Sequence, residues 1–166
     1  KKKIEFWLKD DYKILSNIYY KTSFGITYID YILFTHKGIF ILKIKKLGNV
    51  DISGSIKGKN WSVAKPHVKR YDMPNVKKYK INNPIIEKNR DLKTIKMLLG
   101  IKENVYSLVI YPNKVVFNKT ISKNVIIEKE FHHFYLSKSV NQLTSIKIKK
   151  YYDILNNSRI RSLFIG

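Results

Sequence analysis

Cysteine is absent from the 166 residues of this sequence. Disulfide frameworks, cysteine-ligated zinc, iron–sulfur clusters and thiol nucleophiles are therefore excluded. Long hydrophobic runs are absent as well, because no segment approaches the roughly 18 uninterrupted apolar residues that a membrane-spanning helix requires. We therefore exclude a spanning helix within this sequence and expect the protein to be cytoplasmic.

Acidic residues are scarce: 12 Asp and Glu stand against 33 Lys and Arg, which gives a formal net charge of +21. Lysine outnumbers arginine 29 to 4, a bias that A/T-rich codons favour, yet such codons can also encode Asp and Glu. The shortage of acids therefore indicates a real electrostatic preference. A strongly positive field attracts polyanions, so nucleic acid is the first expected partner and an anionic membrane surface is the second.

Hydrophobic residues make up 44% of the chain, which is enough for one folded domain over residues 1–166. Asn83-Pro84 has the residue types of a helix start, and Gly100 has that of a helix end. The pattern predicts strands at 12–20, 27–34, 39–46, 51–56, 61–63, 105–111, 115–117 and 125–128, and helices at 84–100 and 139–155. We therefore predict a mixed α/β (α+β) fold.

A hairpin gives the strongest local signal in the sequence. A four-residue turn, Thr35–Gly38, separates two apolar strands, and counting outward from it places Asp30 opposite Lys43, with Lys45 on the same face. An ionised carboxylate in an apolar strand is costly unless it is paired or ligated. Asp30 could hold Mg²⁺ in a phosphodiesterase centre where a lysine stabilises the phosphate. The alternative, which the local residue types favour, is a cross-strand ion pair with Lys43 that leaves Lys45 in solvent.

Around this hairpin the sequence resembles the nuclease-related domain family, NERD, of the restriction-endonuclease-like PD-(D/E)xK superfamily. The segment Ile29–Leu33 is similar to the family's strand with the first catalytic Asp, and Gly38–Leu42 is similar to the strand that follows. Further similarities between about Asp11 and Tyr111 are Gly48, Gly54, Trp61 and the Asn83-Pro84 helix start followed by Glu87. The resemblance implies a central mixed β-sheet flanked by helices, and metal-dependent hydrolysis of DNA with Mg²⁺ or Mn²⁺.

The resemblance also implies a catalytic set of Asp30, Lys43, Lys45 and Glu87, in which Asp30 ligates the metal and Lys45 stabilises the phosphate. One position departs from the family pattern. The family's second strand carries Glu-x-Lys, and this sequence has Lys43 at the position of the Glu. An ammonium there cannot ligate Mg²⁺ and repels it by several kcal/mol at an effective dielectric of about 20. We therefore expect weak or impaired hydrolysis, although Glu87, where the family has Gln, could partly replace the missing carboxylate. Asp91 stands where the family often has His.

A basic segment spans residues 65–80, with tyrosines between its cations. Such a segment could follow a phosphate backbone while its aromatic rings contact bases, or it could be a solvated basic loop. The expected nucleic-acid-binding residues are Lys65, Lys69, Arg70, Lys77 and Lys78.

Two functions from different classes follow. The first is a nuclease, or a degenerate nuclease, that acts on DNA. The second is a non-catalytic nucleic-acid-binding or protein-interaction module in which Asp30 and Lys43 form a salt bridge. His132 and His133 are adjacent, so on a strand they would face opposite sides and would not share a metal ion. The helix at 139–155 is expected to pack on the core with a basic outer face, with a membrane-surface helix as the alternative.

Overall fold

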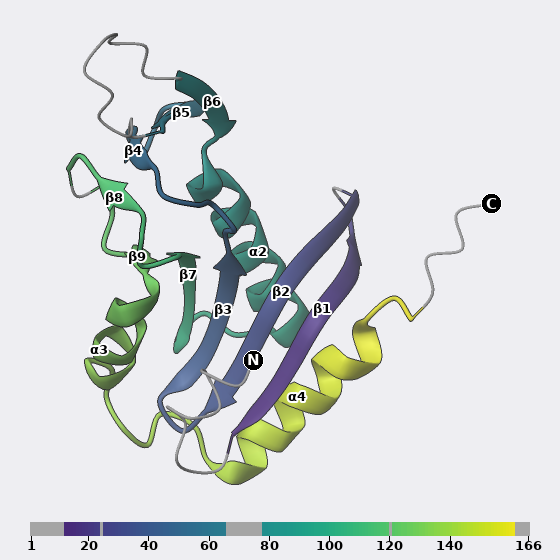
Figure 1. Cartoon of the computed structure of the whole chain (residues 1–166). Coiled ribbons are helices and arrows are strands. Elements are labelled where there is room, and N and C mark those ends of the chain that lie inside the picture. The colour runs from purple at the N-terminus through teal and green to yellow at the C-terminus, as the bar shows by residue number, and fades with distance from the viewer. Residues whose placement is uncertain (1–11, 24, 66–77, 120, 162–166) are drawn as a thin grey trace, which may run out of the picture.

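The computed structural model describes residues 12–23, 25–65, 78–119 and 121–161. At its centre is a five-stranded sheet with the order β1-β2-β3-β7-β9 (Figure 1). The strands β1, β2 and β3 are antiparallel neighbours, whereas β7 and β9 run parallel to β3. Their bounds are β1 (Lys13–Thr22), β2 (Gly25–Thr35), β3 (Gly38–Ile44), β7 (Val105–Tyr111) and β9 (Val125–Ile127).

A smaller four-stranded sheet, with the order β6-β5-β4-β8, lies at the upper end of the central sheet in Figure 1. Its strands are β4 (Asp51–Ser53), β5 (Asn60–Ala64), β6 (Lys78–Asn82) and β8 (Val116–Phe117). The buried Trp61 packs in one cluster with Val109 and Tyr111 of β7, so this cluster joins the two sheets. Gly54 lies against the Trp61 ring, where a Cβ atom would clash, and glycine is therefore needed there.

Helices cover both faces of the central sheet. They are α2 (Pro84–Leu99), α3 (Phe131–Leu136) and α4 (Ser145–Ser158), with a 3-10 turn at Glu128–Glu130 before α3. On one face, Ile95 of α2 and Ile148 of α4 share a core cluster with Ile41 of β3. On the other face, Phe131 of α3 packs in a second cluster with Phe40. The fold is thus the predicted mixed α+β arrangement of restriction-endonuclease-like type, a mixed sheet flanked by helices.

Helix α2 is fixed firmly at its first turn by Asn83. The Asn83 side-chain oxygen accepts a hydrogen bond from the Ile85 N–H at 2.9 Å, which caps the helix. The two N–H groups of its amide nitrogen point to three carbonyl oxygens of the β4–β5 loop at 2.7 to 3.3 Å, those of Ser55, Ile56 and Gly58, so one hydrogen is shared. One side chain therefore holds the start of α2 against the smaller sheet.

The predicted hairpin and central helix are confirmed. Strands β2 and β3 pair from Thr35 with Gly38 to Tyr31 with Leu42, in the register counted from the turn. Helix α2 ends at Gly100, whose φ of 65° is a left-handed conformation that favours glycine.

Two other predictions of secondary structure are wrong, and the strand considered for the two adjacent histidines is not present. The closing helix starts at Ser145 rather than at residue 139, because the Thr144 side chain caps it by accepting from the Lys147 N–H at 3.3 Å. His132 and His133 lie on helix α3 and not on a strand. Residues 78–80, expected at the end of the basic loop, belong to strand β6, which pairs with β5.

Candidate functional site

The end of strand β3 carries two of the predicted site residues. Ile39 and Ile41 pack in the cluster that contains α2, and alternation along the strand puts Lys43 on the same face. Lys45 follows the strand, and its backbone N–H donates to the Ile110 carbonyl at 2.9 Å. Strand β7 therefore fixes the backbone of this segment beneath α2.

The first half of helix α2 carries the carboxylates that face these lysines. Glu87 and Asp91 are four residues apart, so they lie one turn apart on the same side of the helix. Asp91 is 1% exposed, whereas Glu87 is only partly buried. The helix therefore presents one deeply buried carboxylate and one close to the surface.

These four side chains form ion pairs with alternating sign. Lys43 Nζ lies 3.2 Å from Asp91 Oδ2 and 3.7 Å from Glu87 Oε2. The same Glu87 oxygen accepts a hydrogen bond from Lys45 Nζ at 3.2 Å. Lys43, whose side chain is 12% exposed, is thus enclosed between two carboxylates, and Lys45 is the outer cation.

A further buried cation, Lys88, was not singled out from the sequence. It is 5% exposed, and its Nζ donates a hydrogen bond to the Ser107 hydroxyl of β7 at 3.1 Å. Burial lowers the pKa of Lys88, and the negative charge of Asp91 opposes that shift. Helical spacing could have found it, because Lys88 lies seven residues before the buried Ile95 and therefore on the inner face.

Asp91 carries the strongest sign of an unusual environment. Burial raises the pKa of its carboxyl group, although the neighbouring Lys43 acts in the opposite direction through its charge and its hydrogen bond. Its Oδ1 atom is buried and has no hydrogen-bond partner within the described residues. We call the five side chains that lead from the interior to the surface the charge row: Lys88, Asp91, Lys43, Glu87 and Lys45.

Asp30 does not form the predicted ion pair with Lys43. Among the described residues, the ion pairs of Lys43 are with Glu87 and Asp91 of α2. Asp30 Oδ2 instead accepts a hydrogen bond from the backbone N–H of Ile44 at 2.9 Å. Two carboxylates on α2 thus neutralise Lys43, while a backbone donor stabilises the Asp30 carboxylate.

The physical reason is a shift in the side-chain alternation of β2 at Asp30. Ile29 and Ile32 belong to the same core cluster, although a regular strand places residues three apart on opposite faces. On the neighbouring strand β1, Asn17 has a φ of 52°, with pairs to β2 formed on both sides of it. The prediction that Asp30 lies opposite Lys43 assumed two regular strands. The irregularity at Asp30 explains why these two side chains do not pair.

The residues of this site do not fit a divalent cation. Such an ion needs several oxygen ligands around one point. No group of three or more His, Cys, Asp or Glu side chains suited to a metal exists in the part of the chain that the structure describes. The Lys43 ammonium itself lies between the Glu87 and Asp91 carboxylates, and it repels a second cation there. We therefore derive no reaction step through Mg²⁺ or Mn²⁺.

A basic cleft of about 460 Å³ opens beside Lys45. Its walls come from the end of β3, the loop after it, strand β6 and helix α2, and the lining residues are Lys45, Lys46, Leu47, Lys80, Ile81, Asn82 and Glu87. Lys46 and Lys80 are exposed and were not among the predicted binding residues. The alternating exposure of β6 places Lys80 on the solvent side. The cleft therefore offers three ammonium groups against one carboxylate.

The predicted nucleic-acid-binding residues fall into two groups. Lys65 and Lys78 are exposed at one end of the β5–β6 pair, where Ala64 pairs with Lys78. Lys78 lies on the same face of β6 as Lys80 of the cleft. The other three, Lys69, Arg70 and Lys77, lie outside the described residues.

Comparison with known proteins gives one match. No curated protein and no solved structure matches the chain. Within the described residues, the helices are too short or too polar to cross a membrane. The family model described as "Nuclease-related domain" matches residues 1–112, which is more than half of the sequence and includes the whole charge row. With the site and the mixed sheet described above, this match shows that the chain belongs to NERD, the nuclease-related domain family.

Proposed function

We propose that this chain is a nuclease-related domain that binds nucleic acid, DNA in the first place, and hydrolyses it weakly or not at all. The observation that carries the proposal is the position of Lys43, whose ammonium lies 3.2 Å from Asp91 and 3.7 Å from Glu87. Membership of the family supports a nucleic-acid substrate and, in general, metal-dependent chemistry. Lys43 removes the ligand that metal chemistry needs, while Lys45, Lys46 and Lys80 of the cleft supply the affinity for phosphate.

Binding is supported by the charge and shape of the cleft. Lys45, Lys46 and Lys80 converge on a space open to solvent, and Lys78 extends their positive surface along β6. Phosphate contacts with lysine release counterions from the nucleic acid, so affinity depends steeply on salt. The net charge of +21 strengthens the attraction at long range.

Weak hydrolysis is supported by the residues that surround the expected catalytic position. Asp30 accepts a hydrogen bond from the Ile44 N–H, and the ion pairs of Lys43 are with the carboxylates of α2 instead. Lys45 remains in the position where a lysine stabilises phosphate charge, but it shares its charge with Glu87 at 3.2 Å. Asp30 would be the family's metal ligand, and the Lys43 ammonium opposes any ion bound beside it.

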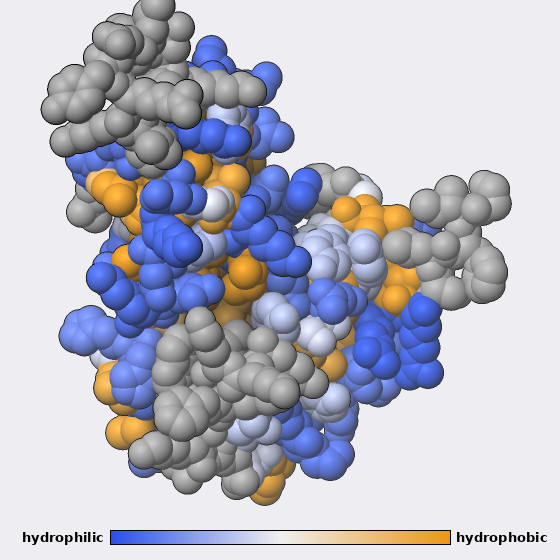
Figure 2. Space-filling view, in the orientation of Figure 1, coloured by the Kyte–Doolittle hydropathy of each residue, from blue (hydrophilic) through white to orange (hydrophobic). Residues whose placement is uncertain are grey.

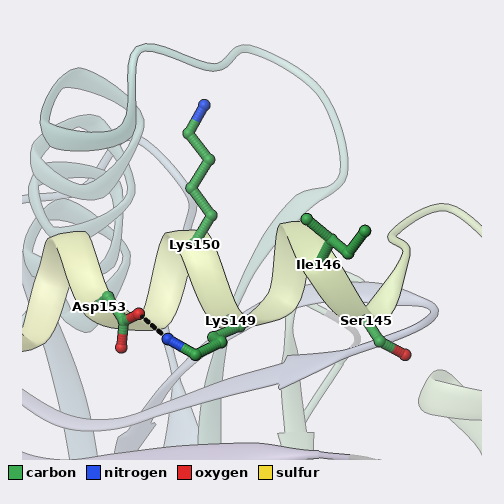
Figure 3. A pocket seen from close by; sticks show the side chains of 5 residues that line it. All are labelled: Ser145, Ile146, Lys149, Lys150 and Asp153. Atoms are coloured by element: carbon green, nitrogen blue, oxygen red, sulfur yellow. Dashed lines mark hydrogen bonds and ion pairs between the residues drawn. The ribbon is translucent and has the colours of Figure 1, made fainter.

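The binding half of the proposal is tested by fluorescence anisotropy with labelled single-stranded and duplex DNA over a range of salt concentrations. In the double variant Lys46→Gln, Lys80→Gln we expect weaker binding and a log–log salt slope for duplex DNA that is smaller in magnitude by about 2. The matched control is Lys147→Gln, Lys150→Gln on the exposed face of α4, which removes the same charge elsewhere. Figure 3 shows Lys150 directed away from the helix.

Equal effects of the two double variants would show that net charge, and not the cleft, governs binding. Absence of salt-dependent binding to either probe would contradict nucleic-acid recognition and leave protein interaction as the function.

The catalytic half is tested by incubating supercoiled plasmid with the parent chain in Mg²⁺, in Mn²⁺ and in EDTA. We expect the parent to cleave no faster than the variant Lys45→Ala, which lacks the expected phosphate-stabilising ammonium. Rapid cleavage that needs the metal ion and disappears in Lys45→Ala would overturn this half.

A further inference from the structure

We propose that the Lys43 ammonium is a tethered substitute for the divalent cation, so that nucleic-acid phosphate binds at this site without a metal ion. This inference rests on the proposed function for its ligand. The contacts that carry it are those of Lys43 Nζ with Asp91 and Glu87, the two carboxylates that α2 presents one turn apart.

The buried carboxylate of α2 needs an opposite charge. Asp91 is 1% exposed, and a charged group at that depth is costly without an opposite charge. In metal-dependent sites a bound cation supplies that charge. Here Lys43 supplies it from strand β3 at 3.2 Å, with a side chain that is itself 12% exposed.

A single substitution at position 43 would create a carboxylate site. The change Lys43→Glu would place a third carboxylate beside Glu87 and Asp91, on a strand whose backbone β7 holds in place. Three converging carboxylates repel each other and form a donor set that a divalent cation relieves. The parent chain avoids this requirement because its cation is covalently attached.

The outer end of the charge row reaches the basic cleft. Lys45 is 29% exposed, shares Glu87 with Lys43 and lines the cleft. Phosphate in the cleft therefore meets ammonium groups directly, and its binding requires no bridging ion. Affinity for DNA should be the same in EDTA and in Mg²⁺ when the ionic strength is matched.

The test is thermal unfolding of the parent chain and of Lys43→Glu in EDTA and in millimolar Mn²⁺, Mg²⁺ or Ca²⁺. We expect Lys43→Glu to unfold at a lower temperature in EDTA and to regain about 5 °C or more with Mn²⁺. The parent should shift by less than about 1 °C. Lys43→Gln removes the charge without a third carboxylate, and Lys147→Glu reverses a charge on the exposed face of α4; neither should respond to Mn²⁺.

A response of the parent equal to that of Lys43→Glu, or no response of a folded Lys43→Glu, would overturn the inference. If Lys43→Glu does not fold, the decisive measurement is the DNA affinity of the parent in EDTA and in Mg²⁺ at matched ionic strength. We expect values within about twofold, and a tenfold tightening by Mg²⁺ that is lost in Asp30→Asn would refute the tethered cation.

The two proposals fail separately. If the parent binds no DNA, the proposed function fails, while metal-dependent stabilisation of Lys43→Glu still supports the tethered cation. If the parent binds DNA only with a metal ion, the inference fails and the nucleic-acid function stands.

Discussion

The two halves of helix α2 lie over the same sheet and bury their inner faces with opposite chemistry. The first half buries Lys88 and Asp91, whereas the second half buries Ile95 and Leu99. The polarity of β3 changes in the same sense, from Ile39 and Ile41 to the lysine at position 43. A buried apolar side chain therefore needs only neighbours of complementary volume, whereas a buried charged side chain needs a specific partner.

The charged half is expected to give the largest effect. Asp91→Ala removes the nearer of the two carboxylates that pair with Lys43 and the negative charge that favours the Lys88 ammonium, and we expect a loss of about 4 kcal/mol in the free energy of unfolding. In urea denaturation, the double variant Lys43→Met, Asp91→Ala should lose less free energy of unfolding than the sum of the two single variants. We expect the difference to be about 1–3 kcal/mol. Strict additivity would show that Lys43 and Asp91 are not coupled.

The apolar half gives the next effect. Ile95 is 0% exposed, so Ile95→Ala should lower the free energy of unfolding by about 3 kcal/mol through lost burial and a cavity. Met97 on the same helix is 53% exposed, and Met97→Ala should change stability by less than about 0.5 kcal/mol in the same urea titration. A similar loss in both would contradict the assignment of the inner face.

Asn83 distinguishes the cap of α2 from its anchor to the β4–β5 loop. Asn83→Ala removes the cap and the hydrogen bonds donated to the loop, and we expect a loss of about 2–3 kcal/mol. Asn83→Asp keeps the capping acceptor but loses the donors, so chemical denaturation separates the two contributions. Full stability of Asn83→Asp would show that the loop contacts contribute nothing.

The smallest expected effect is a change in pH dependence. Burial lowers the pKa of Lys88 below its ordinary 10.5, so between the two values the unfolded chain binds more protons and stability rises with pH. Lys88→Met removes this rise, and the difference between parent and variant should grow towards pH 10.5. The control is the exposed Lys102→Met, for which we expect no such difference.

Buried Tyr20 and Tyr111 also affect stability at alkaline pH, because burial raises the pKa of each hydroxyl. They are unchanged in both variants, so they cancel when each variant is subtracted from the parent. A parallel pH dependence of parent and Lys88→Met would contradict the lowered pKa.

The parts of this structure that local sequence determines were predictable. The turn before Gly38 fixed the register of β2 and β3, and Asn83 and Gly100 fixed the ends of α2. Counting from the same turn placed Lys43 on β3, and Lys45 directly follows the end of that strand. These features depend on residues close together in the chain, where turn and capping chemistry act directly.

The parts that depend on distant residues were not predictable in the same way. The shift of alternation at Asp30 coincides with the left-handed Asn17 on another strand, which no pattern within β2 reveals. The partners of Lys43 lie more than forty residues away on α2. Helical spacing places Lys88 on the inner face of α2, but its hydrogen-bond partner, Ser107 of β7, follows only from the packing of the helix on the sheet. Charge pairs of this kind are set by tertiary structure.

The charge row gives this protein two separate responses to salt. Its inner members, Asp91 and Lys43, are shielded from solvent, so dissolved ions screen their attraction little. Lys45 and the cleft lysines are accessible, and salt weakens their hold on phosphate. Hydrophilic side chains are prominent on the face that Figure 2 shows, and screening relieves the mutual repulsion of a chain with a charge of +21. Raising the ionic strength should therefore release nucleic acid while making the folded domain more stable.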